Sequence, residues 1–182
     1  MEDYAYVIDF IPQRAYQKES EALVQLIGEK FFTLLLATSR SDVFLPIGKR
    51  VYVGKDKRDE ITKIKKKMEY SELSSSAKDN MEIIVKKVIE SREKEFVDFF
   101  NRAGSITARV HQLELLPGIG KKHVEHILKE RDSKPFESFE DIRARVHGID
   151  PVKSFTDRII NELKGQEKYF LFSKPSLPPG RP

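Results

Sequence analysis

The stretch Leu115-Leu116-Pro117-Gly118-Ile119-Gly120-Lys121-Lys122 decides the fold of the C-terminal third of the chain. Its two glycines tolerate positive φ and carry no Cβ, so another group can approach the backbone closely there. The amides that follow begin a helix, where they lack intrahelical acceptors and lie at the positive end of the helix dipole. Ile119 is predicted to pack between the flanking helices. The pattern predicts a helical hairpin whose phosphate-binding residues are Gly118, Ile119, Gly120, Lys121 and Lys122.

A second copy of this stretch follows at an offset of 30 residues, from Gly118 to Gly148. Residues 146–152 keep the glycine and the isoleucine but neither the lysine pair nor the second glycine. Asp150, at the position of Gly120, is expected either to repel a phosphate or to cap the following helix. Lys153 partly restores the charge. Gly148 and Lys153 are therefore predicted phosphate contacts of a hairpin that either binds weakly or serves only to pack the first.

Apolar spacing predicts four helices around the two turns, which together make an all-α domain over residues 105–164. Pro151 suits the first position of the last helix, because its missing amide would have no partner there. An alternative interpretation treats both hairpins as ordinary helix–helix turns that pack or contact protein. The in-register repeat and the lysine pair favour phosphate binding. The predicted helices contain Ile106, Val110 and Leu113; Lys121–Arg131; Ser138–Val146; and Pro151–Leu163.

The first 54 residues have the pattern of short strands separated by glycine and proline. Two apolar runs flank Gly28-Glu29-Lys30, as they would in a hairpin. Residues 61–73 are ambiguous between helix and strand, and we favour a strand that closes or extends a barrel. The sequence predicts a small β-barrel over residues 1–73; an OB-like or an SH3-like barrel fits the number of strands. The predicted strands are Tyr4–Phe10, Ala22–Ile27, Phe31–Thr38, Val43–Leu45 and Arg50–Val53.

A long amphipathic helix is predicted over residues 74–104, linking the barrel to the C-terminal domain. The serines at 74–76 supply an N-cap, and Gly104 suits the end of the helix. Residues 165–182 end in a proline-rich run and are expected to be extended or disordered. The predicted fold class is α+β, a small N-terminal OB-like β-barrel followed by an all-α domain of two helical hairpins.

One short segment carries the positive charge of the chain. The formal net charge is +4, and residues 49–67 alone contain nine Lys or Arg against three acids. Tyr52 and Tyr70 interleave with these cations, a pattern typical of single-stranded nucleic-acid binding. Alternatively, the lysines only keep an edge strand from aggregating. The predicted contacts of this segment are Lys49, Arg50, Tyr52, Lys63, Lys65, Lys66 and Lys67.

Several classes of function lack support in the sequence. The chain has no Cys, no glycine-rich phosphate loop and no nucleophile elbow, so a non-catalytic protein without a cofactor is expected. His123 and His126 have helical spacing but no third ligand accompanies them, so no metal site is predicted. The longest apolar run, Phe31–Ala37, is far too short to span a bilayer, and residues 1–20 lack the apolar core of a signal peptide. A soluble, cytoplasmic protein without a membrane partner is expected.

The quoted hairpin stretch resembles the helix-hairpin-helix family. That resemblance implies a tandem helix-hairpin-helix domain whose two hairpins touch the two strands of a duplex about a pseudo-dyad. It also implies a monovalent cation on the carbonyls of Glu114, Leu116 and Ile119. Over nearly its full length the chain is similar to a conserved archaeal family of unknown function that joins a barrel to such a domain. The stretches that carry this resemblance are Arg50–Gly54, His111–Gly120, Phe136–Asp141 and Lys168–Phe172.

These patterns favour a non-catalytic protein that recognises a nucleic-acid backbone independently of sequence, through hairpin amides and a basic barrel surface. The archaeal resemblance implies a partner in translation or transcription and therefore RNA, although backbone amides do not distinguish RNA from DNA. The alternatives are a protein-interaction adaptor on the ribosome or RNA polymerase, or a subunit of a DNA repair or processing complex. Single- or double-stranded target, pathway and oligomeric state stay open.

Overall fold

The computed structural model describes residues 1–12, 21–40 and 42–174. The chain divides into two compact units. One is built from residues 1–84 together with the chain from Ile159 onward, and the other from residues 85–158. Two helices, α1 (Ser75–Ser91) and α5 (Pro151–Leu163), pass from one unit into the other. Within the described residues no helix is both long and apolar enough to cross a membrane.

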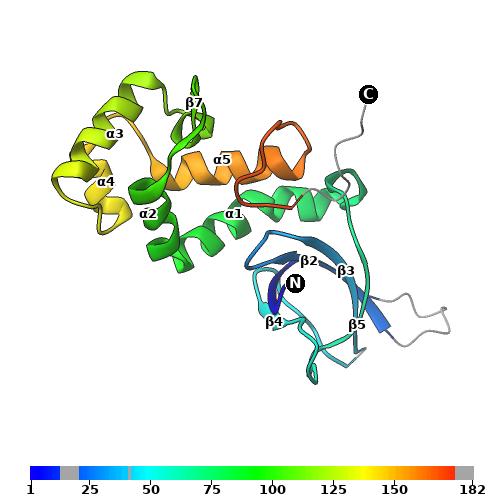
Figure 1. Cartoon of the computed structure of the whole chain (residues 1–182). Coiled ribbons are helices and arrows are strands. Elements are labelled where there is room, and N and C mark those ends of the chain that lie inside the picture. Colours follow the sequence, from blue (N-terminus) through cyan, green and yellow to red (C-terminus); the bar gives the residue numbers. More distant parts are fainter. Residues whose placement is uncertain (13–20, 41, 175–182) are drawn as a thin grey trace. The chain divides into compact units, whose positions relative to one another are not determined.

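The first unit contains an antiparallel sheet in the order β4-β1-β2-β3-β5, which curls into a half-barrel (Figure 1). Alternate residues face the inside of the curl, so apolar positions two apart, such as Val24 and Leu26, are fully buried there. In the described part of the chain no ladder joins β4 to β5, so the sheet stays open. The predicted α+β class with a barrel-like sheet is confirmed. The strands are β1 (Tyr4–Ile11), β2 (Glu21–Gly28), β3 (Leu34–Arg40), β4 (Arg50–Tyr52) and β5 (Ile61–Lys67).

The structure differs from the strand predictions at three places. The strand predicted from Phe31 begins at Leu34, because the amides of Phe31 and Thr33 donate to the carboxylate of Glu2. Val43–Leu45 is a loop whose Leu45 side chain enters the sheet core, because the chain must cross here from β3 to the far edge of the sheet. The strand predicted over residues 61–73 ends at Lys67, and Tyr70–Glu72 form a short 3-10 helix, η1. The carboxylate of Glu72 accepts the amide of Glu69 at 2.8 Å and closes that turn.

A buried carboxylate shapes the turn between β2 and β3. Glu2 accepts the amides of Lys30, Phe31 and Thr33 at 2.8, 2.9 and 3.2 Å. A Cβ on Gly28 would lie 2.2 Å from the carboxyl group of Glu2. The predicted hairpin is present, and its glycine makes room for this carboxylate.

Ser74 connects the sheet to the start of α1. Its hydroxyl accepts the amide of Ala77 at 3.0 Å, as an N-cap does, and donates to Asp9 at 2.6 Å. Its own amide donates to the side chain of Gln25 on β2 at 3.1 Å. The predicted cap therefore also fixes the helix on the sheet.

The chain after α5 is held by Glu162, a buried residue of that helix. Its carboxylate accepts the amides of Leu171, Phe172 and Ser173 at 2.8, 3.1 and 2.9 Å, and the Ser173 hydroxyl at 2.9 Å. The segment up to Lys174 is thus tied to the helix, whereas the sequence led us to expect an extended or disordered tail from residue 165. Residues 175–182 of that prediction lie outside the described residues.

The second unit is mainly helical. The ring of Phe155, on α5, is fully buried at its centre, and ring centroids lie 4.8 Å away in Phe96 and 5.5 Å away in Phe100. Its further elements are α2 (Glu93–Arg102), β6 (Ser105–Thr107), β7 (Val110–His111), the 3-10 helix η2 (Gln112–Leu115), α3 (Lys121–Ser133) and α4 (Phe139–Arg145).

Two helix predictions also differ from the structure. The single helix predicted over residues 74–104 is interrupted at Arg92, which has φ −116° and ψ 28° and whose guanidinium donates to Glu95 in the first turn of α2. The helix predicted from Ile106, Val110 and Leu113 is instead the β6–β7 hairpin followed by η2. The hydroxyl of Thr107 accepts the amide of Arg109 at 3.2 Å, and this local turn competes with a helix.

Candidate nucleic-acid interface

The first hairpin runs from η2 through residues 116–120 into α3. Leu113, Leu116 and Ile119 are buried, so the predicted packing role of Ile119 is present. The turn is closed by the amide of Ile119, which donates to the carbonyl of Leu116 at 3.1 Å, and by Gly118 at φ +85°. A residue with a Cβ would be strained at that φ, so the glycine is required by conformation.

The turn presents its amides to solvent. Gly118, Gly120, Lys121 and Lys122 are all exposed. The first intrahelical bond of α3 is from the amide of Val124 to the carbonyl of Gly120, at 3.0 Å. Within the part of the chain that is described, the amides of Lys121 and Lys122 have no acceptor, and neither ammonium group has an ion-pair partner. The amide of Gly120 donates to Nδ1 of His123 at 3.4 Å, a long hydrogen bond.

The second hairpin has the same backbone turn as the first, but a carboxylate accepts the amides at the start of its second helix. Gly148 has φ +85°, the value found at Gly118. The carboxylate of Asp150 accepts the amides of Val152 and Lys153 at 3.1 and 3.3 Å. The ammonium group of Lys153 lies 2.8 Å from Asp157. Of the two roles expected for Asp150, the structure shows the cap. At the offset of 30 residues Lys121 corresponds to Pro151, which has no amide hydrogen, and Lys122 corresponds to Val152, whose amide is occupied.

The two turns lie against each other's second helices. A Cβ on Gly118 would lie 3.8 Å from the hydroxyl of Ser154 on α5, and a Cβ on Gly148 would lie 3.6 Å from Nε2 of His123 on α3. These reciprocal contacts relate the hairpins by an approximate two-fold symmetry, as their sequence repeat suggests. Each turn therefore lies close to the helix that follows the other turn.

Arg158 is a residue of this site that sequence reasoning missed. Its side chain is buried, with 2% exposed, and its guanidinium donates to the carbonyl of Leu115 at 3.1 Å. The sequence signal that could have identified Arg158 is its place on the inward face of α5, next to Phe155 and Ile159. The resemblance implied a cation on the carbonyl of Leu116, but that carbonyl accepts the amide of Ile119, and a fixed positive charge already lies at the adjacent residue. The cation on the carbonyls of Glu114, Leu116 and Ile119 stays a prediction.

Arg145 fastens the helices that carry the hairpins. Its guanidinium donates to the carbonyls of Glu130 and Lys134 at 2.6 and 2.8 Å and pairs with the Glu130 carboxylate at 3.1 Å. It also lies over the ring of Phe136, 4.5 Å from the centroid. These contacts hold the end of α3 against α4 and so fix the spacing of the two turns.

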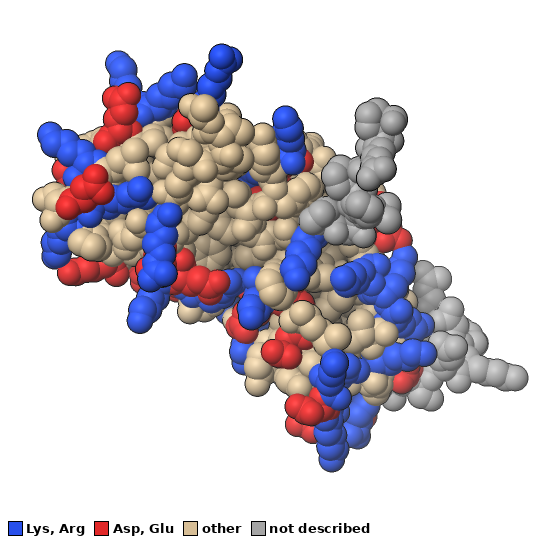
Figure 2. Space-filling model, viewed as in Figure 1, with Lys and Arg blue, Asp and Glu red and all other residues tan. Residues whose placement is uncertain are grey.

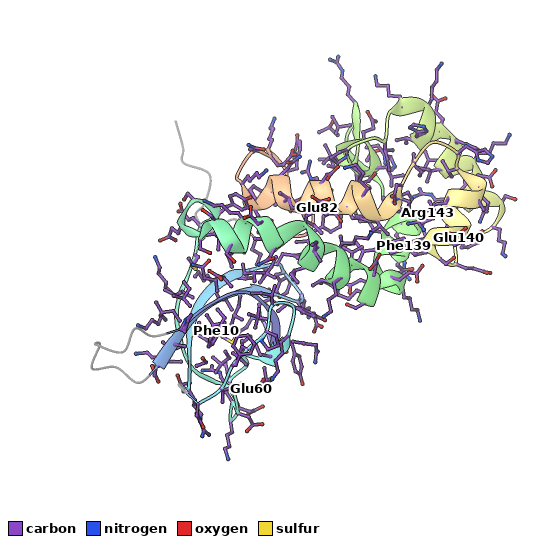
Figure 3. All side chains as sticks on the ribbon, turned by 180° about the vertical axis from the view of Figure 1, so that it is seen from behind. Phe10, Glu60, Glu82, Phe139, Glu140 and Arg143 are labelled. Carbon is purple, nitrogen blue, oxygen red and sulfur yellow. The ribbon has the colours of Figure 1, made fainter. Side chains whose placement is uncertain are left out.

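The outer face of α4 is polar. Phe139 is buried, whereas Glu140 and Arg143 lie towards solvent and form an ion pair at 3.5 Å (Figure 3). Arg143 also pairs with the capping Asp150 at 3.3 Å. This pairing adds a second internal partner to the carboxylate at the second hairpin.

In the first unit, basic side chains are numerous but interspersed with acidic ones (Figure 2). Arg50 donates twice to Glu29, both at 2.8 Å, and its guanidinium lies 3.4 Å from the ring centroid of Tyr4. The hydrogen bond to Glu29 is the main cause that raises the pKa of Arg50. The further internal pairs among the predicted contacts are Lys49 with Glu60, Lys66 with Glu72, and Tyr52 with Asp56.

Three lysines of the basic segment keep their charge available. Lys63, Lys65 and Lys67 lie on β5, an edge strand, and are exposed. Among the described residues none of them has a hydrogen-bond or ion-pair partner. Glu21 is the acidic residue whose pKa responds to these lysines. Hydrogen bonds from Thr62 and Thr38 are the main cause that lowers its pKa, and the positive charges of Lys65 and Lys63 lower it further.

Sequence reasoning also missed an aromatic pair at the sheet. Phe44 is 72% exposed, and its ring packs edge-on against Phe10 with centroids 5.3 Å apart. The sequence assigned Phe44 to a strand, where it would have been one of several apolar core candidates. The predicted aromatic residues are engaged differently: Tyr52 packs edge-on against Tyr4 at 5.4 Å, and Tyr70 lies near the ammonium groups of Lys78 and Lys164.

Comparisons with known proteins agree on one family. The family model described as "Protein of unknown function (DUF655)" matches residues 1–174. The uncharacterized protein MJ0038 of Methanocaldococcus jannaschii is 40% identical over 175 residues, which cover 95% of this chain and 80% of that protein. The crystal structure of Af1531 from Archaeoglobus fulgidus, from the same family, is similar with a TM-score of 0.86 and 47% identity, covering 95% of this chain and 100% of that one. The expected resemblance to an archaeal family of unknown function is confirmed, and the chain belongs to the DUF655 family.

Proposed function

We propose that the protein binds the phosphate backbone of a nucleic acid through its first hairpin and performs no catalysis there. The observation that carries the proposal is the difference between the two turns. The amides of Lys121 and Lys122 have no internal acceptor, whereas at the equivalent positions after Gly148 Pro151 has no amide hydrogen and the amide of Val152 is capped by Asp150. A helix start with open amides and two adjacent lysines attracts an oxyanion. We assign the paired turns to the helix-hairpin-helix class on this basis.

The binding is independent of base sequence. Main-chain amides and lysine ammonium groups contact phosphate, which is the same at every nucleotide. The exposed backbone at Gly118 and Gly120 matters because a phosphate must come within hydrogen-bond distance of the amides. RNA and DNA both satisfy this chemistry. An OB-like role for the half-barrel, with Lys63, Lys65 and Lys67 against a second stretch of the strand, belongs to the same proposal.

Gly120→Ala is the sharpest test of close approach. The φ of Gly120 is −94°, and an added Cβ would meet no atom within 4 Å, so the fold should tolerate alanine. The added methyl would nevertheless lie where the phosphate approaches. We expect weaker binding of a labelled duplex in a fluorescence titration, with an unchanged melting temperature. Unchanged affinity in a variant that is fully folded would refute contact with the turn backbone.

Gly118→Ala and Gly148→Ala form a matched pair. Both place a Cβ at φ +85°, so each should destabilise the fold by about 1–2 kcal/mol. Only Gly118→Ala should also reduce the affinity beyond what its lowered stability explains. If both variants reduce it equally, the effect comes from the fold and the assignment to the first turn fails.

The lysine pair is tested by salt dependence. Each phosphate contact contributes a slope of roughly −0.9 to a plot of log affinity against log salt. Replacing Lys121 and Lys122 together by alanine should therefore flatten the slope by about 2. Affinity without salt dependence, together with a protein partner that stays bound after nuclease treatment and high salt, would favour an adaptor instead.

A further inference from the structure

The imidazole of His123 lies between the two glycine turns. Its Nδ1 accepts the amide of Gly120 at 3.4 Å, and its Nε2 lies 3.6 Å from the position that a Cβ on Gly148 would take. His123 is the third residue of α3, and side chains on a helix lean towards its N-terminus. One ring therefore reaches from the start of α3 to the second turn.

The hydrogen bond at Nδ1 decides what Nε2 can do. A neutral imidazole that accepts at one nitrogen carries its hydrogen on the other, so Nε2 of His123 is an N–H donor. Within the described part of the chain this nitrogen has neither an acceptor nor an ion-pair partner. The backbone that it faces is open, since His147 and Gly148 are both exposed. An unused donor therefore lies at the exposed second turn.

Ser154 repeats this arrangement in the opposite direction. It is the fourth residue of α5 and is 4% exposed, and its hydroxyl lies 3.8 Å from the position that a Cβ on Gly118 would take. Among the described residues this hydroxyl has no hydrogen-bond partner, a state that costs stability in a buried group and that a ligand oxygen would relieve. It keeps access to solvent, because in the described chain the side-chain oxygen that is both sealed and unbonded is that of Ser39. Each turn is thus faced by an unused donor from the helix that follows the other turn.

Nε2 of His123 also lies close to the open amides of the first hairpin. One hydrogen bond of 3.4 Å and the width of the ring separate Nε2 from the Gly120 nitrogen, which precedes the amides of Lys121 and Lys122. A phosphate oxygen accepts a hydrogen bond at about 2.9 Å, so one phosphate group can bridge donors roughly 6–8 Å apart. The imidazole donor and the open amides are therefore within reach of the same nucleic-acid backbone.

The charges at the second turn are compensated within the hairpin. The carboxylate of Asp150 accepts the amides of Val152 and Lys153 and pairs with Arg143 at 3.3 Å. The ammonium group of Lys153 is paired with Asp157 at 2.8 Å. The second turn therefore has no free donor of its own for an oxyanion, and His123 supplies one from the first hairpin.

We propose that the two hairpins exchange phosphate ligands, with Nε2–H of His123 donating to a backbone phosphate at the second turn and the Ser154 hydroxyl donating to one at the first. The proposal rests on the proposed function, since the ligand is the backbone held by the amides of Lys121 and Lys122. Neither new donor is charged, so its hydrogen bond releases no counterion and its contribution to affinity does not depend on salt. The second hairpin thereby gains a binding role that its capped amides do not have.

His123→Asn and His123→Gln form a matched pair. Asparagine places its amide oxygen near the position of Nδ1 and has no donor at that of Nε2, whereas the longer glutamine places its NH2 group near Nε2. The assay is a titration of labelled duplex at about pH 8, where an ordinary imidazole is neutral. His123→Asn should weaken binding roughly tenfold at every salt concentration, and His123→Gln should stay within about threefold of the native chain.

Ser154→Ala removes the second donor and leaves a good helix former in its place. We expect a loss of affinity of roughly tenfold with an unchanged salt slope, in contrast to the flatter slope of the lysine double variant. His126→Asn, at an exposed position of the same helix as His123, is the control and should bind like the native chain. Native affinity in either His123→Asn or Ser154→Ala would refute the exchange of ligands, and so would a loss that disappears as the salt concentration rises.

Inorganic phosphate separates this proposal from the proposed function. In nuclear magnetic resonance titrations with phosphate, the imidazole nitrogens of His123 should shift together with the amides of Lys121 and Lys122, and those of His126 should not. If the two amides shift without the His123 ring, the exchange of ligands is refuted and the hairpin proposal stands. If the ring and the amides all respond to phosphate but no nucleic acid binds, the donor assignment is supported and the nucleic-acid function is refuted. If none of them responds, both proposals are refuted.

Discussion

Replacing Asp150 by glycine should make the second hairpin more like the first, although Pro151 and Val152 stay where the first has Lys121 and Lys122. The substitution removes the carboxylate that accepts the amides of Val152 and Lys153 at 3.1 and 3.3 Å, and it leaves Pro151 at the first position of α5. Exchange of an aspartate cap for glycine costs a few tenths of a kcal/mol, about 0.3. The ion pair with Arg143, whose side chains are 39% and 54% exposed, adds at most about 0.5 kcal/mol. The melting temperature should fall by only about 1–4 °C.

The expected gain in phosphate affinity also comes from removing the Asp150 carboxylate. Removing one negative charge about 4 Å from a bound phosphate oxygen relieves a repulsion of about 1 kcal/mol in water, and two amides become free to donate. We expect duplex affinity to rise at least roughly fivefold at low salt. Asp150→Asn is the matched control, because asparagine caps as well as aspartate but carries no charge. It should give a smaller gain, since the two amides stay occupied.

The assay is a fluorescence titration of labelled duplex at several salt concentrations, with thermal unfolding of each variant alongside. The order of affinity should be Asp150→Gly, then Asp150→Asn, then the native chain. If Asp150→Gly stays folded and binds no more tightly than the native chain, open amides at a glycine turn are not what attracts phosphate. The reasoning for the first hairpin would then be refuted as well.

Three further predictions concern stability. Glu162→Gln should destabilise the fold by about 2–4 kcal/mol, because a buried carboxylate that accepts four hydrogen bonds becomes an amide whose NH2 group faces amide donors. Glu82→Gln, at an exposed position, is the control, and urea unfolding measures the stability of both variants. Arg145→Lys should cost about 1–3 kcal/mol, since a lysine cannot reach two carbonyls and a carboxylate together, and a melting temperature equal to the native value would contradict this. Burial, and secondarily Arg131, lowers the pKa of His111, so the unfolded chain takes up the proton first. Stability should therefore be full above about pH 6.5 and decline as the pH falls below it, and the decline should be shallower in His111→Gln when urea unfolding is repeated across pH.

Local patterns predicted much of the fold. The alternation along β1–β3 and the glycine at position 28 predict the hairpin that the structure contains. Ser74 caps α1 by accepting the amide of Ala77 at 3.0 Å, and Pro151 begins α5. Positive φ was expected at Gly118 and Gly120; Gly118 has φ +85°, whereas Gly120 has φ −94° and needs no left-handed backbone. Each of these features depends on residues that are close in sequence, so the interactions that produce it do not depend on the rest of the fold.

Some sequence patterns are compatible with two different structures, and at these places the prediction from sequence was wrong. Three apolar residues between 106 and 113 have helical spacing, yet Ile106 and Val110 lie in the β6–β7 hairpin. Phe44 had the neighbours of a strand residue and lies in a loop. The interruption at Arg92 follows no local breaker, because arginine is itself a good helix former. At residues 107–109 the local turn in which the Thr107 hydroxyl accepts the Arg109 amide competes with the helix, and at Phe44 the chain must cross to the far edge of the sheet.

The sequence by itself determined where the charges are, which turns need glycine, and that two hairpins repeat at a fixed offset. Only the tertiary structure decided which charges are free. Arg50 meets Glu29, 21 residues away, and Lys49 meets Glu60, 11 residues away, whereas Lys63, Lys65 and Lys67 project from the edge of the sheet. Sheet order and register select the partner of each ion, and they follow from burial of the whole apolar face rather than from the residues next to the charge.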